Sequence, residues 1–323
     1  MTTRQPTPIR ALTAQATDLS AAIDCFLTYC RAKNLSENTL TYYRYRLEAF
    51  RRYVEEHGST TIPTEIGSGL IRDFIISETK IRSASTAHHD VVALRAFFNF
   101  LTREGLVREN PMRGVETVKR PRKLINTFTP EQVKAVLSTC RNDFVGIRDQ
   151  AIVMLLYDTG MRAGELCSLK LEDVQATDNR IKVVGKGNKE RMLSYGQATG
   201  LALARYLARR PQLPTNSLFV SCYGCPTNRH HIARIVRSRC RKAGITGVRC
   251  SPHTLRHSFA VQYLRNGGDA FTLQRLLGHA DLTMTRVYCE VSETDALEKL
   301  RALSPGDRLN LSGAMVGRRR RIV

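Results

Sequence analysis

The sequence predicts a mainly α-helical protein with two domains, an all-helical first domain and a mixed α/β second domain that is mostly helical and has a small β-sheet. Apolar residues recur at helical spacing in both parts of the chain. A basic, proline-interrupted segment without that spacing separates them, and a later segment places two glycines in a tight turn between β-rich stretches. At 323 residues and 42% hydrophobic content, the chain is long enough for two cores.

Net charge indicates the class of partner. The 50 Lys and Arg residues outnumber the 29 Asp and Glu residues, which gives a formal net charge of +21 and an isoelectric point near 10.0. A polyanion is therefore the expected ligand. No signal-peptide pattern and no apolar run of about 18 residues is present, so we expect a cytoplasmic protein without a membrane partner. The nine cysteines, an odd number, are expected to be reduced thiols.

The first domain is expected over residues 18–112. Helical spacing of apolar residues begins at Leu19, Ser36 is the expected N-cap of a second helix, and two more helical segments follow over residues 70–75 and 91–101. The side of the second helix opposite its apolar face carries Arg44, Arg46, Arg51 and Arg52. These arginines either follow a DNA backbone or form an ordinary solvated face.

A linker is expected over residues 113–127, because residues 118–123 are basic and interrupted by proline. The second domain is expected over 128–305, since residues 129–132 (Thr-Pro-Glu-Gln) have the pattern of a capping box with proline at the first helical position. A basic tail, 306–323, ends in an arginine run, which is either a binding segment or a disordered solubilising end.

Two segments of the second domain place a basic residue at a turn. Gly160 is expected to end one helix, and Arg162 begins the next, where a guanidinium can bind two oxygens of a phosphodiester or pair with Glu165. Lys186 lies between two glycines at the tip of a hairpin over 180–194. There it either donates a proton to a departing alkoxide or simply solubilises the loop.

The remaining candidate residues, two histidines, an arginine and a tyrosine, follow later in the second domain. Ser251 and Pro252 predict a helix start that puts His253 and Arg256 on one electropositive face, suited to the equatorial oxygens of a phosphorane. His257 is expected to face elsewhere. His279 follows a glycine C-cap, and Tyr288 lies on a short amphipathic segment. Each alone is more typical of a structural residue, but their occurrence together in one domain indicates a site that binds and attacks a phosphate.

These frames resemble the tyrosine recombinase (phage integrase) family, especially its Xer-like and transposon-borne members. The matching segments are Thr-Gly-Met-Arg-Ala-Gly-Glu-Leu, Gly-Lys-Gly-Asn-Lys-Glu-Arg, His-Thr-Leu-Arg-His-Ser-Phe-Ala and Leu-Leu-Gly-His-Ala, in that order. The resemblance covers nearly the whole chain. It implies a SAM-like, helical core-binding domain followed by the family's catalytic domain.

The resemblance also implies roles for these residues. Tyr288 would attack the scissile phosphate to form a 3′-phosphotyrosyl link, and Lys186 would protonate the leaving 5′ oxygen. Stabilisation of the transition state would come from Arg162, His253, Arg256 and His279. The basic linker residues Lys119, Arg120, Arg122 and Lys123 would help to clamp DNA, and Arg44 and Arg51 are expected DNA contacts because of the net charge and the basic face of their helix. The expected partner is double-stranded DNA with inverted core sites, bound by a homo- or hetero-tetramer without metal or other cofactor.

Other interpretations are weaker. Cys222 and Cys225, near His230 and His231, lack the spacing of a zinc finger and are expected to be ordinary thiols. A type IB topoisomerase-like activity uses similar chemistry, but the short two-domain form favours recombination. A silent DNA-binding regulator has no use for the full set of catalytic groups. Mobile-element recombination is favoured over Xer-type dimer resolution because of the basic tail and because there is no room for an arm-binding domain.

Overall fold

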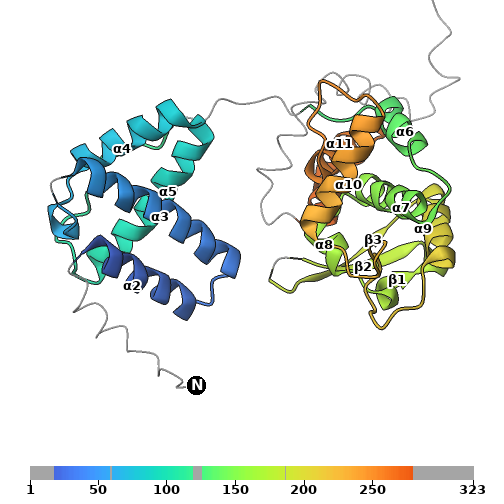
Figure 1. Ribbon diagram of the computed structural model, residues 1–323, viewed down its shortest axis with the longest axis horizontal. Coiled ribbons are helices and arrows are strands. Elements are labelled where there is room, and N and C mark those ends of the chain that lie inside the picture. Colours follow the sequence, from blue (N-terminus) through green and yellow to red (C-terminus); the bar gives the residue numbers. More distant parts are fainter. Residues whose placement is uncertain (1–17, 59, 119–125, 186, 279–323) are drawn as a thin grey trace, which may run out of the picture. The chain divides into compact units, whose positions relative to one another are not determined.

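The computed structural model describes residues 18–58, 60–118, 126–185 and 187–278. It divides the chain into two compact units, residues 1–123 and 124–323, here called unit 1 and unit 2 (Figure 1). Each unit has its own hydrophobic core. The finer domain limits expected from the sequence stay predictions. Within the described residues, no helix is long and apolar enough to cross a membrane.

Unit 1 is a bundle of helices. Its described elements are α2 (Leu19–Ala32), α3 (Glu37–His57), the 3₁₀ turn η1 (Pro63–Glu65), α4 (Ser68–Ile81) and α5 (Ala84–Arg103). Side chains of Asp18, Ser36 and Ser83 accept backbone N–H groups in the first turns of α2, α3 and α5, which confirms Ser36 as an N-cap.

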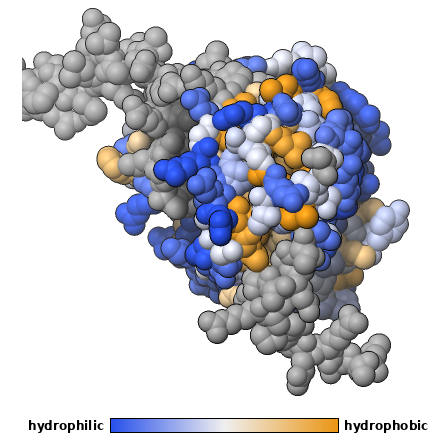
Figure 2. Space-filling model, turned by 90° about the vertical axis from the view of Figure 1, so that its left-hand side faces the viewer, coloured by the Kyte–Doolittle hydropathy of each residue, from blue (hydrophilic) through white to orange (hydrophobic). Residues whose placement is uncertain are grey.

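Aromatic side chains form much of the core of unit 1. The Phe26 ring contacts those of Tyr43 and Phe97, and Phe50 contacts Phe74 and Phe98, all at short centroid distances. These edge-on contacts join α2, α3, α4 and α5 and add to the free energy of apolar burial. Figure 2 shows one face of the molecule, on which the described surface is largely hydrophilic, with apolar residues among the polar ones.

Unit 2 is mostly helical, with one small sheet, as the sequence predicts. Its described elements are α6 (Pro130–Ser138), α7 (Phe144–Thr159), α8 (Ala163–Ser168), η2 (Leu171–Asp173), β1 (Val174–Gln175), η3 (Ala176–Asp178), β2 (Arg180–Val184), β3 (Glu190–Ser194), α9 (Gln197–Arg209), α10 (Arg229–Lys242), α11 (Pro252–Arg265) and α12 (Ala270–Leu277). The three strands pair antiparallel in the order β1-β2-β3, with Ile181 opposite Leu193. The expected hairpin and the capping box of Thr129 and Gln132 are confirmed.

Helix α7 is the central element of unit 2. It is buried on most sides, and α9, α10 and α11 pack against it. Its Asp149 carboxylate accepts hydrogen bonds from Arg148 on the same helix and from Arg239 on α10. Arg239 also donates to the Thr139 carbonyl at 2.7 Å. Because Arg148, Asp149 and Arg239 are buried, the cluster fixes α10 on α7 through one carboxylate shared by two guanidinium groups.

Candidate active site

The end of α7 and the start of α8 place Arg162. Gly160 adopts the left-handed conformation, with φ of 61°, and a Cβ there would lie 2.3 Å from Phe259 Cδ1, so both the turn and the close approach of α11 require glycine. Arg162 follows as the N-cap of α8 with extended backbone angles. Its guanidinium is therefore held at an electropositive helix N-terminus.

Glu165 holds the Arg162 side chain. Its carboxylate accepts the Arg162 backbone N–H at 2.7 Å and the Arg162 Nη1 at 2.8 Å. Burial acts to raise the pKa of Glu165, but hydrogen bonds from Arg191 and Arg162 outweigh it and lower the pKa below its ordinary value. The carboxylate is thus ionised at neutral pH. The Arg162 side chain is 37% exposed, so part of the guanidinium still faces solvent.

Arg256 is held on α11 by backbone carbonyls. Ser251 caps the helix and Pro252 occupies its first turn, as the sequence predicts. The buried Arg256 guanidinium donates to the Gly160 carbonyl at 2.7 Å and to the Leu277 carbonyl at 2.8 Å. Arg162 Nη2 donates to the next carbonyl along the chain, that of Gly278, at 3.3 Å. The two arginines therefore converge on the C-terminal end of α12, where Gly278 is the left-handed C-cap.

His253 lies within the field of both arginines. Desolvation comes first among the causes that lower its pKa, followed by the positive charges of Arg256, Arg162 and Arg249. The imidazole is consequently neutral near pH 7 and can accept or donate one hydrogen bond. The expectation that His257 faces elsewhere is wrong. Its ring lies 4.8 Å from that of His253, because residues i and i+4 share a helix face.

The structure thus brings together three of the six expected catalytic residues, and the other three lie outside its described part. Lys186, His279 and Tyr288 belong to that second group, as do Lys119, Arg120, Arg122 and Lys123 of the linker. The hairpin is described on both sides of Lys186. The Gly185 N–H donates to the Lys189 carbonyl at 2.8 Å, and Gly187 and Asn188 have positive φ. This tight turn is the one that the glycine pattern predicts.

The arginines of α3 differ among themselves. Arg44 is exposed, whereas Arg51 lies between Glu48 and Glu55 and forms an ion pair with each. Placing Arg46 on the solvated side of α3 was wrong. It forms an ion pair at 3.1 Å with the buried Asp90 of α5, and its side chain is only 16% exposed.

Helix α10 carries a basic surface that the sequence patterns did not single out. Its buried residues include Ile232, Ile235 and Val236, and its exposed residues include Arg229, His230, Arg234, Arg237, Arg241 and Lys242. The sequence signal that could have revealed this surface is the apolar stripe of α10 opposite a run of arginines. The Arg229 guanidinium packs on Gly164 of α8, where a Cβ would lie 2.7 Å from Nε. Because Gly164 follows Arg162 by two positions, this basic surface of α10 begins close to Arg162.

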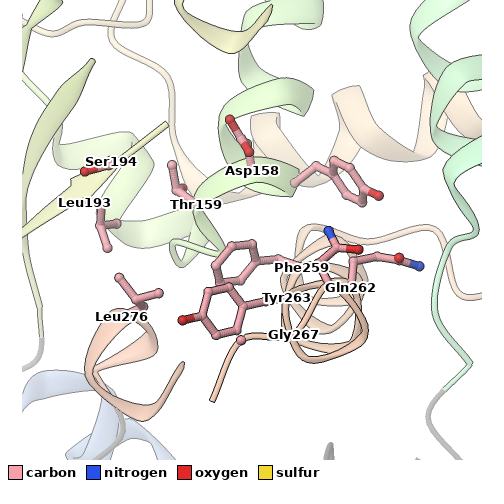
Figure 3. Close-up of a pocket in the computed structure, with 12 residues that line it drawn as sticks. Asp158, Thr159, Leu193, Ser194, Phe259, Gln262, Tyr263, Gly267 and Leu276 are labelled. Atoms are coloured by element: carbon pink, nitrogen blue, oxygen red, sulfur yellow. The ribbon is translucent and has the colours of Figure 1, made fainter. Parts of the chain in front are cut away.

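A cavity of about 650 Å³ lies between α7, β3, α11 and α12 in the described residues, and it holds none of the expected catalytic side chains. Phe259 and Tyr263 of α11 face Leu193 of β3 across it (Figure 3). Among the residues that the structure describes, no group of three or more His, Cys, Asp or Glu side chains is placed to hold a metal ion. Cys222 and Cys225 are exposed.

The chain resembles known proteins in both sequence and fold. Residues 126–295 match the model of the phage integrase family, and residues 23–105 match that of the phage integrase N-terminal SAM-like domain. The tyrosine recombinase XerD of Oceanobacillus iheyensis is 32% identical over 295 residues, which cover 89% of this chain and 99% of the relative.

Two solved structures share the fold. The XerH site-specific recombinase, in a post-cleavage complex with palindromic difH substrate, superimposes with a TM-score of 0.71 at 21% identity and covers 91% of this chain and 86% of its own. The Tn1549 transposon integrase, in complex with a circular intermediate DNA, gives a TM-score of 0.67 at 21% identity, with 83% and 94% covered.

Proposed function

Because this chain belongs to the phage integrase family of tyrosine recombinases, which cut and rejoin DNA strands, we propose that it recombines DNA with Tyr288 as nucleophile and with Arg162, Lys186, His253, Arg256 and His279 as supporting groups. Site-specific recombination is the activity of the family. The assignment of these six residues is our proposal.

The convergence of Arg162 and Arg256 carries this proposal. Two guanidinium groups from different helices donate to adjacent carbonyls, of Leu277 and Gly278, and a neutral imidazole lies in their field. Such an arrangement holds positive charge in place before a ligand arrives. It suits a phosphodiester whose equatorial oxygens gain negative charge during displacement.

The reaction is a transesterification. The Tyr288 oxygen forms a bond to the scissile phosphorus as the bond to the 5′ oxygen breaks, and the phenolic proton is lost to a base. Lys186, beside Gly185 at the hairpin turn, donates a proton to the departing 5′ oxygen. Because the phosphotyrosyl link conserves the ester, the 5′ hydroxyl of another strand reverses the attack without an external energy source.

The substrate is double-stranded DNA with inverted core sites, bound by a homo- or hetero-tetramer. The net charge of +21 and the basic surface of α10 support a DNA ligand, with Arg44 and the linker residues as further phosphate contacts. The DNA-bound XerH and Tn1549 structures share the fold. The protein acts in the cytoplasm, in association with the nucleoid.

Two biological roles suit this activity. Integration, excision or transposition of a mobile element is our first proposal, supported by the basic tail over 306–323 and by the similar fold of a transposon integrase. Resolution of chromosome or plasmid dimers is the alternative, supported by the XerD relative, which aligns over 99% of its length.

Covalent trapping tests the chemistry. A core site is first recovered by selecting random DNA duplexes with the purified protein, and a nicked version of it is then incubated with wild type and with Tyr288→Phe. We expect a denaturation-resistant protein–DNA complex with wild type only. Tight binding of the site without a covalent complex would instead support a silent DNA-binding regulator.

A further inference from the structure

Arg191 links three segments of unit 2 that carry expected catalytic residues or precede them in the chain. It lies on β3, opposite Val183 of β2, and its side chain is 16% exposed. Nη1 and Nη2 donate to the two oxygens of Glu165 at 3.0 and 2.9 Å, and Nε donates to the Leu276 carbonyl at 2.9 Å. One guanidinium therefore joins the hairpin to α8 and to the last turn of α12.

Glu165 is shared between two arginines. Its oxygens accept two hydrogen bonds from Arg191 and two from Arg162, so the buried carboxylate is fully used. Two positive charges and one negative charge leave the trio with a net charge of one positive unit. Without Arg191, the carboxylate would neutralise Arg162 alone, and the positive charge offered to a phosphate would be lost.

Arg191 also packs against the backbone next to two other expected catalytic residues. A Cβ at Gly185, which precedes Lys186 in the chain, would lie 3.3 Å from Arg191 Nη1. A Cβ at Gly278, which precedes His279, would lie 3.2 Å from the same atom. The guanidinium thus lies close to both glycines, and a shift of its position would move the backbone that leads to Lys186 and to His279.

We infer that Arg191 is a positioning residue for DNA cleavage: it balances the charge of Glu165, which leaves the Arg162 charge available to the scissile phosphate, and it holds the hairpin and the end of α12 at the site. The inference rests on the proposed function. In the role we infer, Arg191 acts on the phosphate and the nucleophile only indirectly, through Glu165 and the two glycines.

Single-turnover cleavage tests this role. Wild type, Arg191→Met, Arg191→Lys and the double variant Glu165→Gln/Arg191→Met are compared on the nicked core site at saturating protein, with Arg180→Met, an exposed arginine of β2, as the matched control. We expect Arg191→Met to slow formation of the covalent complex by about 10²-fold. For Arg180→Met, we expect both the dissociation constant for the site and the thermal midpoint to match those of wild type.

The double variant separates charge balance from a merely structural role. It lacks more hydrogen bonds than Arg191→Met, but it also lacks the carboxylate that would neutralise Arg162. We therefore expect it to cleave about tenfold faster than Arg191→Met, a non-additive result typical of coupled groups. Arg191→Lys keeps the positive charge but loses the bidentate contact with Glu165. Its cleavage rate should lie between those of Arg191→Met and wild type.

The outcomes are distinguishable from failure of the proposed function. If wild type forms no covalent complex with the selected site, the proposed nucleophile is wrong and the inference with it. If wild type cleaves and Arg191→Met cleaves equally fast, the inference alone is overturned. It is also overturned if the double variant is slower than Arg191→Met and Arg191→Lys gives no recovery, because that pattern indicates a structural contact only.

Discussion

The two units use buried charge in different ways. In unit 1, the Arg46–Asp90 pair is joined by one hydrogen bond, and within the described residues Asp90 Oδ2 and Arg46 Nε have no hydrogen-bond partner. In unit 2, Oδ1 of the buried Asp149 accepts two hydrogen bonds from Arg148, and its Oδ2 accepts two from Arg239. The same kind of ion pair is incompletely satisfied in one unit and saturated in the other.

The two units also differ in what these buried charges hold together. In unit 1, aromatic contacts join the helices in addition to the Arg46–Asp90 pair, so a partly satisfied ion pair is tolerated. In unit 2, saturated carboxylates hold arginines of different elements together. Asp149 joins Arg148 of α7 to Arg239 of α10, and Glu165 joins Arg162 to Arg191 of β3. A positively charged site requires such internal acids, because unpaired buried cations are costly.

Breaking the saturated cluster should have the largest effect. Asp149→Asn leaves Arg148 and Arg239 buried without their counter-charge, and we expect the free energy of unfolding of unit 2 to fall by about 3–5 kcal/mol. Urea denaturation followed by far-UV circular dichroism measures this change. Asp73→Asn, an exposed aspartate of α4, is the matched control and should change the unfolding free energy by less than about 0.5 kcal/mol. A small loss for Asp149→Asn would mean that the two units do not differ in this way.

The incompletely satisfied pair should respond in the opposite direction. The double variant Arg46→Met/Asp90→Leu replaces both charges by apolar groups of similar volume, and we expect unit 1 to be unchanged or stabilised by about 1–4 kcal/mol. Thermal unfolding measures it, with Arg46→Met alone as the comparison, because that variant leaves Asp90 unpaired and should be destabilised. A double variant less stable than Arg46→Met would contradict the comparison.

The pH dependence of stability, compared between wild type and this double variant, is a second test of the same pair. Burial raises the pKa of Asp90, and the charge of Arg46 only partly opposes it. The folded protein therefore takes up this proton at a higher pH than the unfolded chain does, and wild type gains stability from Asp90 as the pH falls through the folded pKa. Relative to the double variant, wild type should thus be more stable towards pH 4 than at pH 7.

Local patterns predicted the elements well, and contacts between distant residues account for what they missed. The N-caps at Ser36 and Ser251, the hairpin and the turn at Gly160 depend on neighbouring residues, as does the pairing of Arg162 with Glu165 three residues away. Arg256 instead donates to a carbonyl 96 positions away, and Arg191 donates to a carboxylate 26 positions away. Rules based on the spacing of neighbouring residues cannot predict such contacts. Arg46 was misplaced for the same reason, since its partner is 44 positions away.

The smallest expected effect is a difference in the salt dependence of DNA binding between two arginines of α3 that the sequence alone does not distinguish. Arg44 is exposed and without an ion pair among the described residues, whereas Arg51 already pairs with Glu48 and Glu55. We expect Arg44→Ala to reduce the slope of log affinity against log salt by about one, since a phosphate contact releases about one counterion, and Arg51→Ala to leave the slope unchanged. Fluorescence anisotropy with one DNA duplex at four salt concentrations measures both slopes. Equal losses would mean that the ion pairs of Arg51 open on DNA, and that the surface charges of unit 1 are as available to DNA as an unpaired arginine.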